Sequence, residues 1–250
     1  MSEPIPSGTP LNRSIGRAAR MLGLFSQDEP ELTLATMTAR MGINRATAHR
    51  YALALRHAGL LRYDTARQVY SLGPRIVELA ASALAGLRII KIAGPHMERL
   101  VAATNETAVL SVWNGESPVV VRVDDNTDRI ARIVVRTGTR LPPESGQGKI
   151  FQAFGAGGRG PGMSKVELSR VRSARIAVNS RVVQGIRAIA TPVFQDTELT
   201  AAMAIVGTTA SIPPDPRSAL ARALREAAEV LSAELGFAIT ELPPNERRSG

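Results

Sequence analysis

The sequence contains no cysteine and only three histidines among its 250 residues. The lack of cysteine excludes disulfides and thiolate metal sites, and it fits a reducing compartment. No apolar run approaches the roughly 18 to 20 residues that cross a bilayer. The first residues, MSEPIPSGTPLNRS, lack the apolar core of a signal peptide. We therefore expect a cytoplasmic protein, with disordered segments over residues 1–10 and 241–250.

The scarcity of histidine also bears on catalysis. Two of the three histidines, His49 and His57, lie close together, and the chain beyond Ala103 has neither histidine nor cysteine. A nucleophile–base pair of the usual kind therefore has no base there. His96 sits beside a proline and fits a helix end better than a ligand position, while Asp124-Asp125 is typical of a solvated turn. We expect no catalytic residue, no metal site and no cofactor, and hence no enzyme.

Acidic residues are nearly absent between Leu32 and Arg75, where the only one is Asp64. A solvated helix face normally interleaves both signs of charge. The basic residues of this segment are Arg40, Arg45, Arg50, Arg56, Arg62, Arg67 and Arg75. Together with the net charge of +9, they favour a polyanionic partner and are typical of duplex DNA binding. The alternative is ordinary surface charge in an arginine-rich chain.

The same segment carries the pattern of a helix-turn-helix. Apolar residues at helical spacing end at Gly42, and Asn44 is a good N-cap for a second helix that runs to Gly59. The next stretch, LLRYDTARQVYSLG, predicts a hairpin wing around residues 64–66. A further helix over residues 14–26, capped by Ser14, is expected to pack beneath the other two. A second helix joined by such a turn is the element that enters a DNA major groove.

The rest of the chain reads as a connector followed by an α+β domain. The apolar stripe after Pro74 predicts a helix over residues 74–93, interrupted at Gly94-Pro95 and resumed over residues 96–104. Alternating segments then predict strands: TAVLSVW and PVVVRV around Asn114-Gly115, IARIVVRTG, and a later hairpin of IRAIATPVF and LTAAMAIVG. Short helices near residues 149–154 and 165–173 and a final helix ending at Gly236 complete an antiparallel sheet with flanking helices.

Two glycine patterns invite enzyme interpretations. Residues 155–160, GAGGRG, have the spacing of a dinucleotide-binding turn, but they follow a helical segment and run into a proline instead of joining a strand to a helix. Residues 145–149, SGQGK, lack the Ser or Thr and the glycine spacing of a phosphate loop. Glycine-rich backbone that opens a helix can still present N–H donors to an anion.

In their order and spacing, these segments resemble the IclR family of bacterial transcription regulators. The resemblance rests on RSIGRAARMLGLF, GINRATAHRYALALRHAGLL, VYSLG, TAVLSVWNGESPVVVRV, SGQGK and GIRAIATPVF. It implies a winged helix-turn-helix DNA-binding domain over residues 11–73 and a linker helix over residues 74–93. It also implies a GAF-like α+β effector-binding domain with an antiparallel sheet over residues 94–240. Homodimers or homotetramers on palindromic operators in double-stranded DNA are expected.

The resemblance places the recognition helix within residues 44–57. The candidate DNA contacts are Arg13, Asn44, Arg45, Thr47, His49, Arg50, Tyr51, Arg62 and Arg67. Arg45 and Thr47 lie near the helix start, where base edges are usually met. Arg50 is expected on a phosphate, Tyr51 partly in the core, and the two wing arginines on flanking backbone. Arg13 suits a phosphate or a minor groove, although a solvated position fits it equally.

For the effector pocket, the resemblance points to Gly146, Gln147, Ala188, Ala204 and Val206, with Trp113 and Ile130 as packing surface. Family members that bind small oxo-acids carry hydroxyl side chains where this chain has Ala204 and Val206. An apolar wall would leave a very polar ligand unpaired, at about 1 to 3 kcal/mol for each buried group. We therefore predict an aromatic or longer-chain carboxylate. The segments before Lys149 and over residues 155–162 depart from the family pattern, which leaves the pocket's lid undefined.

The sequence thus predicts a sequence-specific DNA-binding transcription regulator whose operator binding is modulated by a small carboxylate effector. One alternative is a non-specific architectural DNA-binding protein, which needs no pocket. The other is an enzyme whose basic N-terminal part is incidental. Repression and activation are not distinguished, and neither are dimer and tetramer.

Overall fold

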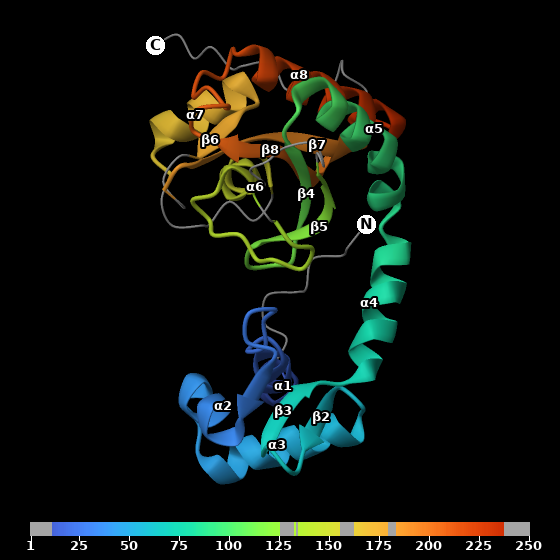
Figure 1. Cartoon of the computed structure of the whole chain (residues 1–250), viewed down its shortest axis with the longest axis vertical. Coiled ribbons are helices and arrows are strands. Elements are labelled where there is room, and N and C mark those ends of the chain that lie inside the picture. The colour runs from blue at the N-terminus through green and yellow to red at the C-terminus, as the bar shows by residue number, and fades with distance from the viewer. Residues whose placement is uncertain (1–11, 126–132, 134, 156–162, 180–183, 238–250) are drawn as a thin grey trace. The chain divides into compact units, whose positions relative to one another are not determined.

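The computed structural model describes residues 12–125, 133, 135–155, 163–179 and 184–237 (Figure 1). The chain divides into two compact units, of which the first ends at Gly86 and the second begins at Leu87. Each unit has a hydrophobic core of its own. The two are therefore described separately.

The first unit combines three helices with a small sheet. The helices are α1 (Arg13–Leu22), α2 (Leu34–Met41) and α3 (Arg45–His57), and the strands are β1 (Glu31–Thr33), β2 (Leu61–Asp64) and β3 (Val69–Leu72). The sheet is antiparallel in the order β1-β3-β2. This arrangement confirms the helix-turn-helix and its wing. Strand β1 was not predicted.

Local chemistry fixes the turn between α2 and α3. Gly42 ends α2 in the left-handed region, with φ of 63°, where glycine meets no steric penalty. The Asn44 side chain then accepts a hydrogen bond from the Thr47 backbone N–H at 2.8 Å and caps α3. Met37 and Met41 of α2 are buried in one core with Ala48 of α3. The two helices thus meet as the sequence predicts.

Helix α1 differs from its prediction at both ends. Its N-cap is Asn12, whose side chain accepts from the Ser14 N–H, so the prediction of Ser14 as cap is wrong. The helix ends at Leu22, short of residue 26, and it buries Met21. Ile15 is 68% exposed. The residue of α1 that reaches the core is Met21, six residues further along the helix.

The connector also differs from its prediction. Helix α4 (Pro74–Gly86) buries none of its residues, and α5 (Arg88–Thr104) runs straight through Pro95. The interruption expected at residues 94–95 is therefore wrong, because the helix break falls at Leu87 instead. Ile89, Ala93 and Met97 of α5 are all buried in the core of the second unit. Their burial outweighs the one helical hydrogen bond that proline does not donate.

The second unit is built on an antiparallel sheet in the order β5-β4-β8-β7-β6. Its strands are β4 (Thr107–Trp113), β5 (Pro118–Asp124), β6 (Ala177–Asn179), β7 (Ile186–Gln195) and β8 (Glu198–Thr208). Both predicted hairpins, β4–β5 and β7–β8, are confirmed. Strand β6 was not predicted as a strand. The predicted strand IARIVVRTG spans residues 130–138. Residues 130–132 and 134 lie outside the described residues, and Ile133 and residues 135–138 belong to no strand.

Helices cover both faces of this sheet (Figure 1). Helices α5 and α8 (Ala219–Glu234) pack on one face, where Met203 and Ile205 of β8 join their core. Helix α6 (Gly146–Phe154) packs on the other face over Ala202 and Ala204, next to α7 (Lys165–Ala174). Alternate residues of β8 therefore serve two different cores, as strand geometry requires.

His96 lies in the middle of α5 and is only 4% exposed, so its expected place at a helix end is wrong. Its Nε2 lies 3.0 Å from Glu234 Oε2 of α8, and its Nδ1 lies 3.2 Å from Arg99 Nη2. The contact with Glu234 ties α5 to α8. The neighbouring proline suggested a helix end, and no local signal in the sequence points to the partner on α8.

Candidate DNA interface and effector region

The exposed face of α3 gathers the charged residues that the sequence predicts as DNA contacts. Ala48, Ala52 and Leu55 are buried beneath the helix. Arg45, His49 and Arg50 are all exposed. Arg45 and His49 are four residues apart and share one side of the helix, whereas Arg50 lies on another side. Arg45 lies in the first helical turn, directly after the Asn44 cap. The structure therefore exposes all three candidates on one helix, with Arg45 and His49 on the same side.

Two further candidates of this helix, Asn44 and Tyr51, make contacts that stabilise α3. Asn44 is exposed, but its side chain oxygen is engaged by the Thr47 N–H. Tyr51 is half-buried against α1, where a hydrogen bond with Ser14 and the charge of Arg17 lower the pKa of its hydroxyl. Tyr51 thus links α3 to α1. Arg13 begins α1 and is exposed.

The wing arginines differ from each other. Arg62 is exposed on β2, whereas Arg67 forms a two-point ion pair with Glu31, with nitrogen–oxygen distances of 2.6 Å. This pair raises the pKa of the Arg67 guanidinium. In the same way Arg40 pairs with Glu29 at 2.6 Å. Glu29 and Glu31 stand just before residue 32, so a count of charges from that residue onward does not include them. The fold alone brings them to the arginines of the segment.

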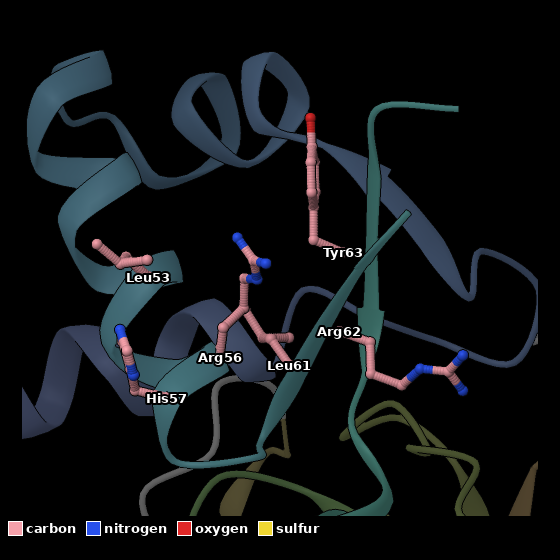
Figure 2. A pocket seen from close by; sticks show the side chains of 6 residues that line it. All are labelled: Leu53, Arg56, His57, Leu61, Arg62 and Tyr63. Atoms are coloured by element: carbon pink, nitrogen blue, oxygen red, sulfur yellow. The ribbon is translucent and has the colours of Figure 1, made fainter. Parts of the chain in front are cut away.

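A surface groove of about 360 Å³ separates the last turns of α3 from the wing. Figure 2 shows its lining residues, which are Leu53, Arg56, His57, Leu61, Arg62 and Tyr63. The Arg56 guanidinium carbon lies 5.1 Å from the centre of the Tyr63 ring, and that ring lies 4.7 Å from Tyr70. In the sequence, Arg56 stands out only by its charge and His57 only as one of three histidines. The spacing of His49, Leu53 and Arg56 by four and three residues was the sequence signal that they share one face of the helix.

In the second unit, the SGQGK segment forms the start of α6 and packs it against the sheet. The Ser145 side chain caps the helix by accepting from the Gly148 N–H at 3.0 Å. A β-carbon on Gly148 would lie 2.4 Å from the Pro143 carbonyl oxygen, so only glycine fits there. Gln147 is buried, and its Nε2 donates to Ser111 Oγ of β4 at 2.8 Å. This glycine pattern therefore serves close packing.

The sheet brings the apolar effector candidates onto the same face as α6. Ala188 of β7 stands opposite Val206 of β8, and Ala190 stands opposite Ala204. A β-carbon on Gly146 would lie 3.2 Å from Ala190 Cβ and 3.6 Å from the Ala188 carbonyl oxygen. Gly146, Gln147, Ala188, Ala204 and Val206 thus occupy one region.

The two remaining packing candidates are Trp113 and Ile130. Trp113 packs on Phe151 of α6 with ring centres 5.5 Å apart, and it lies against the same core that contains Ala204. Ile130 lies outside the described residues.

The structure gives the enzyme-like patterns no support among the residues it describes. Lys149 donates to Glu167 Oε1 at 2.8 Å and to the Val178 carbonyl at 3.3 Å, so its ammonium is already engaged. Gly155, the one described residue of the GAGGRG pattern, follows helix α6 and not a strand. In the described part of the chain, no group of three or more His, Cys, Asp or Glu could hold a metal ion. Nor does any helix of that part have the length and apolarity to cross a membrane.

Comparison with known families agrees with this geometry. Residues 14–65 match the family model of the IclR helix-turn-helix domain. Residues 81–158 match that of the bacterial transcriptional regulator IclR C-terminal domain. The chain belongs to the IclR family. It therefore carries the helix-turn-helix DNA-binding domain and the C-terminal domain of a family of transcription regulators, as the sequence predicts.

Relatives and solved structures of the IclR family resemble the chain over most of its length. It is 26% identical over 264 residues to the DNA-binding transcriptional repressor YiaJ of Escherichia coli K12, spanning 94% of this chain and 91% of that protein. An IclR transcriptional regulator from Silicibacter sp. TM1040 shares its fold, with a TM-score of 0.79 and 23% identity over 92% of this chain and 98% of the other. An IclR homolog from Microbacterium hydrocarbonoxydans, solved with 4-hydroxybenzoate, has a TM-score of 0.67 and 22% identity over 89% and 99%.

Proposed function

We propose that this IclR-family chain recognises a specific operator through the exposed face of α3. The proposal rests on the capped helix, along which Arg45, His49 and Arg50 are all exposed. Arg45 and Thr47 are assigned to base edges, since the N-terminal turn of a recognition helix usually meets them. Arg50 is assigned to a backbone phosphate.

The other candidates have supporting parts in this proposal. Asn44 holds the start of the helix, Tyr51 fixes α3 against α1, and Arg62 and Arg13 contact flanking backbone. Arg67 contacts DNA only in competition with Glu31, which already holds its guanidinium. We therefore expect Arg62 to contribute more than Arg67 from the wing.

A homo-oligomer on a palindromic operator follows from the same proposal. Helix α4 exposes Val77 at 71%, together with Leu79 and Leu84, and α1 exposes Ile15. Apolar side chains of this size are suited to burial between two copies of the chain. A dimer or a tetramer would pair recognition helices on two half-sites. Because the operator is in the cytoplasm, we place the protein there as well.

We assign the effector region to the start of α6 and the sheet face beneath it. A carboxylate suits the N-terminus of α6 at Gly146 and Gln147, where backbone N–H groups and the helix dipole favour an anion. The side chains of Ala188, Ala204 and Val206 offer no hydrogen bond, which favours an aromatic or longer-chain acid. That a family member of the same fold was solved with 4-hydroxybenzoate supports testing this ligand class.

Control of DNA binding by the effector then requires that the effector bind two arrangements of the second unit with different affinities. An acid that binds one arrangement of the second unit better than another shifts the population, and with it the spacing of paired recognition helices. The proposal includes no catalytic step and no cofactor. An architectural binder would need no effector region, and an enzyme would need a reactive group that the described part of this region does not offer.

A selection of random duplex DNA by the purified full chain tests this function. It is run with and without a panel of aromatic acids that includes 4-hydroxybenzoate. We expect an enriched palindrome whose recovery changes with one acid. Enrichment that no acid alters would overturn the effector assignment, and no enrichment under any condition would overturn operator recognition.

A further inference from the structure

Two glutamates of the first unit hold two of its arginines in two-point ion pairs. Glu29 accepts from Nη1 and Nη2 of Arg40 at 2.6 and 2.8 Å. Glu31 meets Nη1 and Nη2 of Arg67 at 2.6 Å each. Both glutamates belong to the short segment that leads into the edge strand β1. This one segment therefore neutralises an arginine in the last turn of α2 and another in the turn of the wing.

Backbone contacts hold both glutamates in position. The Glu29 N–H donates to Ser26 Oγ at 3.1 Å, and the Glu29 carbonyl accepts from the Ser26 N–H at 3.3 Å, which closes a turn. Glu31 stands opposite Ser71 in the antiparallel pairing of β1 with β3. Each carboxylate is thus presented to its arginine from a fixed backbone, so little further entropy is lost when the ion pair forms.

These ion pairs are open to solvent. The four side chains are between 37% and 60% exposed. Exposed pairs are screened by water and salt and contribute little to stability. Their exposure also means that another anion can reach the two guanidinium groups. The pairs are therefore better placed to control what the arginines bind than to hold the fold together.

A carboxylate and a phosphate bind a guanidinium in the same way. Each accepts two parallel N–H bonds from the planar fork of the arginine side chain. Arg40 lies at the end of α2, the helix that crosses the DNA backbone in a helix-turn-helix, and Arg67 lies in the wing. Since both anions need the same N–H groups, each of these arginines binds its glutamate or a phosphate, but not both at once.

The arginines that the proposed function assigns to DNA are in a different position. Arg45, Arg50 and Arg62 are exposed, and none of them forms an ion pair with any residue that the structure describes. The glutamates thus divide the arginines of this unit into a set that is available to DNA and a set that is already occupied.

We propose that Glu29 and Glu31 compete with DNA phosphates for Arg40 and Arg67, and that they thereby limit how strongly the chain binds DNA of any sequence. The inference rests on the proposed function, because it takes duplex DNA as the ligand of the first unit. Sequence-independent affinity comes almost entirely from phosphate contacts, so two occupied arginines lower it. The chain then spends less time on non-operator DNA, which far outnumbers any operator in a genome.

The test titrates the full chain against a labelled mixed-sequence duplex at several salt concentrations. Glu31→Gln keeps the size of the side chain but removes its charge, which releases Arg67. We expect about fivefold tighter binding at about 0.15 M salt and a salt slope steeper by about 0.9, the effect of one added phosphate contact. Glu29→Gln should act in the same way through Arg40. Unchanged affinity and slope in both variants would overturn the proposal.

Two controls separate competition from a general loss of negative charge. Glu78→Gln removes an exposed carboxylate of α4 that has no ion pair in the described part of the chain, and it should leave affinity and slope as in wild type. Adding Arg67→Gln to Glu31→Gln should return the slope to the wild-type value, because no arginine is left to release. An equal gain in Glu78→Gln, or a slope that stays steep in the double variant, would overturn the proposal.

Thermal melting shows whether each variant is folded, and if one glutamate variant is not, the other pair still decides. Because the duplex contains no operator, the salt slopes do not depend on which residues read bases. Unchanged slopes would overturn this inference and leave operator recognition standing. A random selection without enrichment would overturn operator recognition and leave the slopes to be judged on their own.

Discussion

Helices α3 and α6 begin alike and end in opposite roles. Each is capped by a polar side chain that accepts a backbone N–H of the first turn, Asn44 for α3 and Ser145 for α6. Helix α3 then turns most of its side chains to solvent, whereas α6 buries seven of its nine residues. The same start thus begins one helix with an outward charged face, which we propose for DNA, and one with an inward packed face, which we propose for a small ligand. What distinguishes them is the surrounding chain, not the cap.

The largest effect is expected where α6 touches backbone. Gly148→Ala places a methyl group 2.4 Å from the Pro143 carbonyl oxygen, so the helix must shift and the unfolding free energy should fall by about 3 kcal/mol. Calorimetry of the full chain measures the loss in the second unit.

The matched control for that glycine is Gly86→Ala at the end of α4, where the added methyl meets nothing within 4 Å. This variant should be neutral or slightly stabilising, by up to about 1 kcal/mol, because alanine favours helix over glycine. Equal effects of the two substitutions would contradict the packed start of α6.

The next effect comes from the buried hydrogen bond between α6 and β4. Gln147→Leu leaves the buried Ser111 hydroxyl without its donor and should lower the unfolding free energy by about 2 kcal/mol. The double variant Ser111→Ala with Gln147→Leu should recover much of this loss, because removing both partners is nearly neutral. A strictly additive double-mutant cycle would show that the bond does not couple the helix to the sheet.

The two caps themselves give a direct comparison between the helices. Asn44→Ala should cost about 1 kcal/mol in the first unit, a typical value for a lost cap. Ser145→Ala should cost more, up to about 2 kcal/mol, since Ser145 is buried and water cannot replace its bond to Gly148. Chemical denaturation of both variants ranks them, and the reverse order would refute the contrast between outward and inward helices.

The smallest effect is expected at the wing. Arg67→Gln breaks an exposed ion pair with Glu31, and such pairs contribute at most about 1 kcal/mol to stability. Because Glu31 already engages Arg67, loss of DNA affinity should be smaller than for Arg62→Gln. Duplex titrations of the two variants at the same salt concentration compare them. A larger loss for Arg67→Gln would show that the ion pair opens on DNA.

The sequence predicts α3 more completely than α6 for a physical reason. The caps, the apolar repeat and the one-sided charge of α3 are local, and so are the two hairpins of the larger sheet. Strands β1 and β6 have only three residues each and exist through pairing with β3 and β7, which no local pattern reveals. The ion pair of Arg67 and the burial of His96 likewise depend on residues brought together by the fold.

The course of α5 shows how tertiary packing overrides a local signal. Glycine followed by proline at residues 94–95 predicts a break, yet burial of Ala93, Gly94, His96 and Met97 keeps the helix continuous. Gly94 also lies directly against the Arg122 guanidinium, where a β-carbon would come within 2.9 Å of Nη1. A glycine that suggests flexibility in the sequence therefore serves a close contact in the structure.

The proposal that the exposed residues of α3 read DNA sequence is open to a decisive comparison of variants. Random-duplex selection is run in parallel with wild type, Arg45→Ala and Arg50→Ala. We predict that Arg45→Ala relaxes base preference at one position of each half-site, by about 1 to 3 kcal/mol, whereas Arg50→Ala keeps the preferences and weakens all sequences alike. Identical preferences and affinities in all three proteins would show that another element reads the operator.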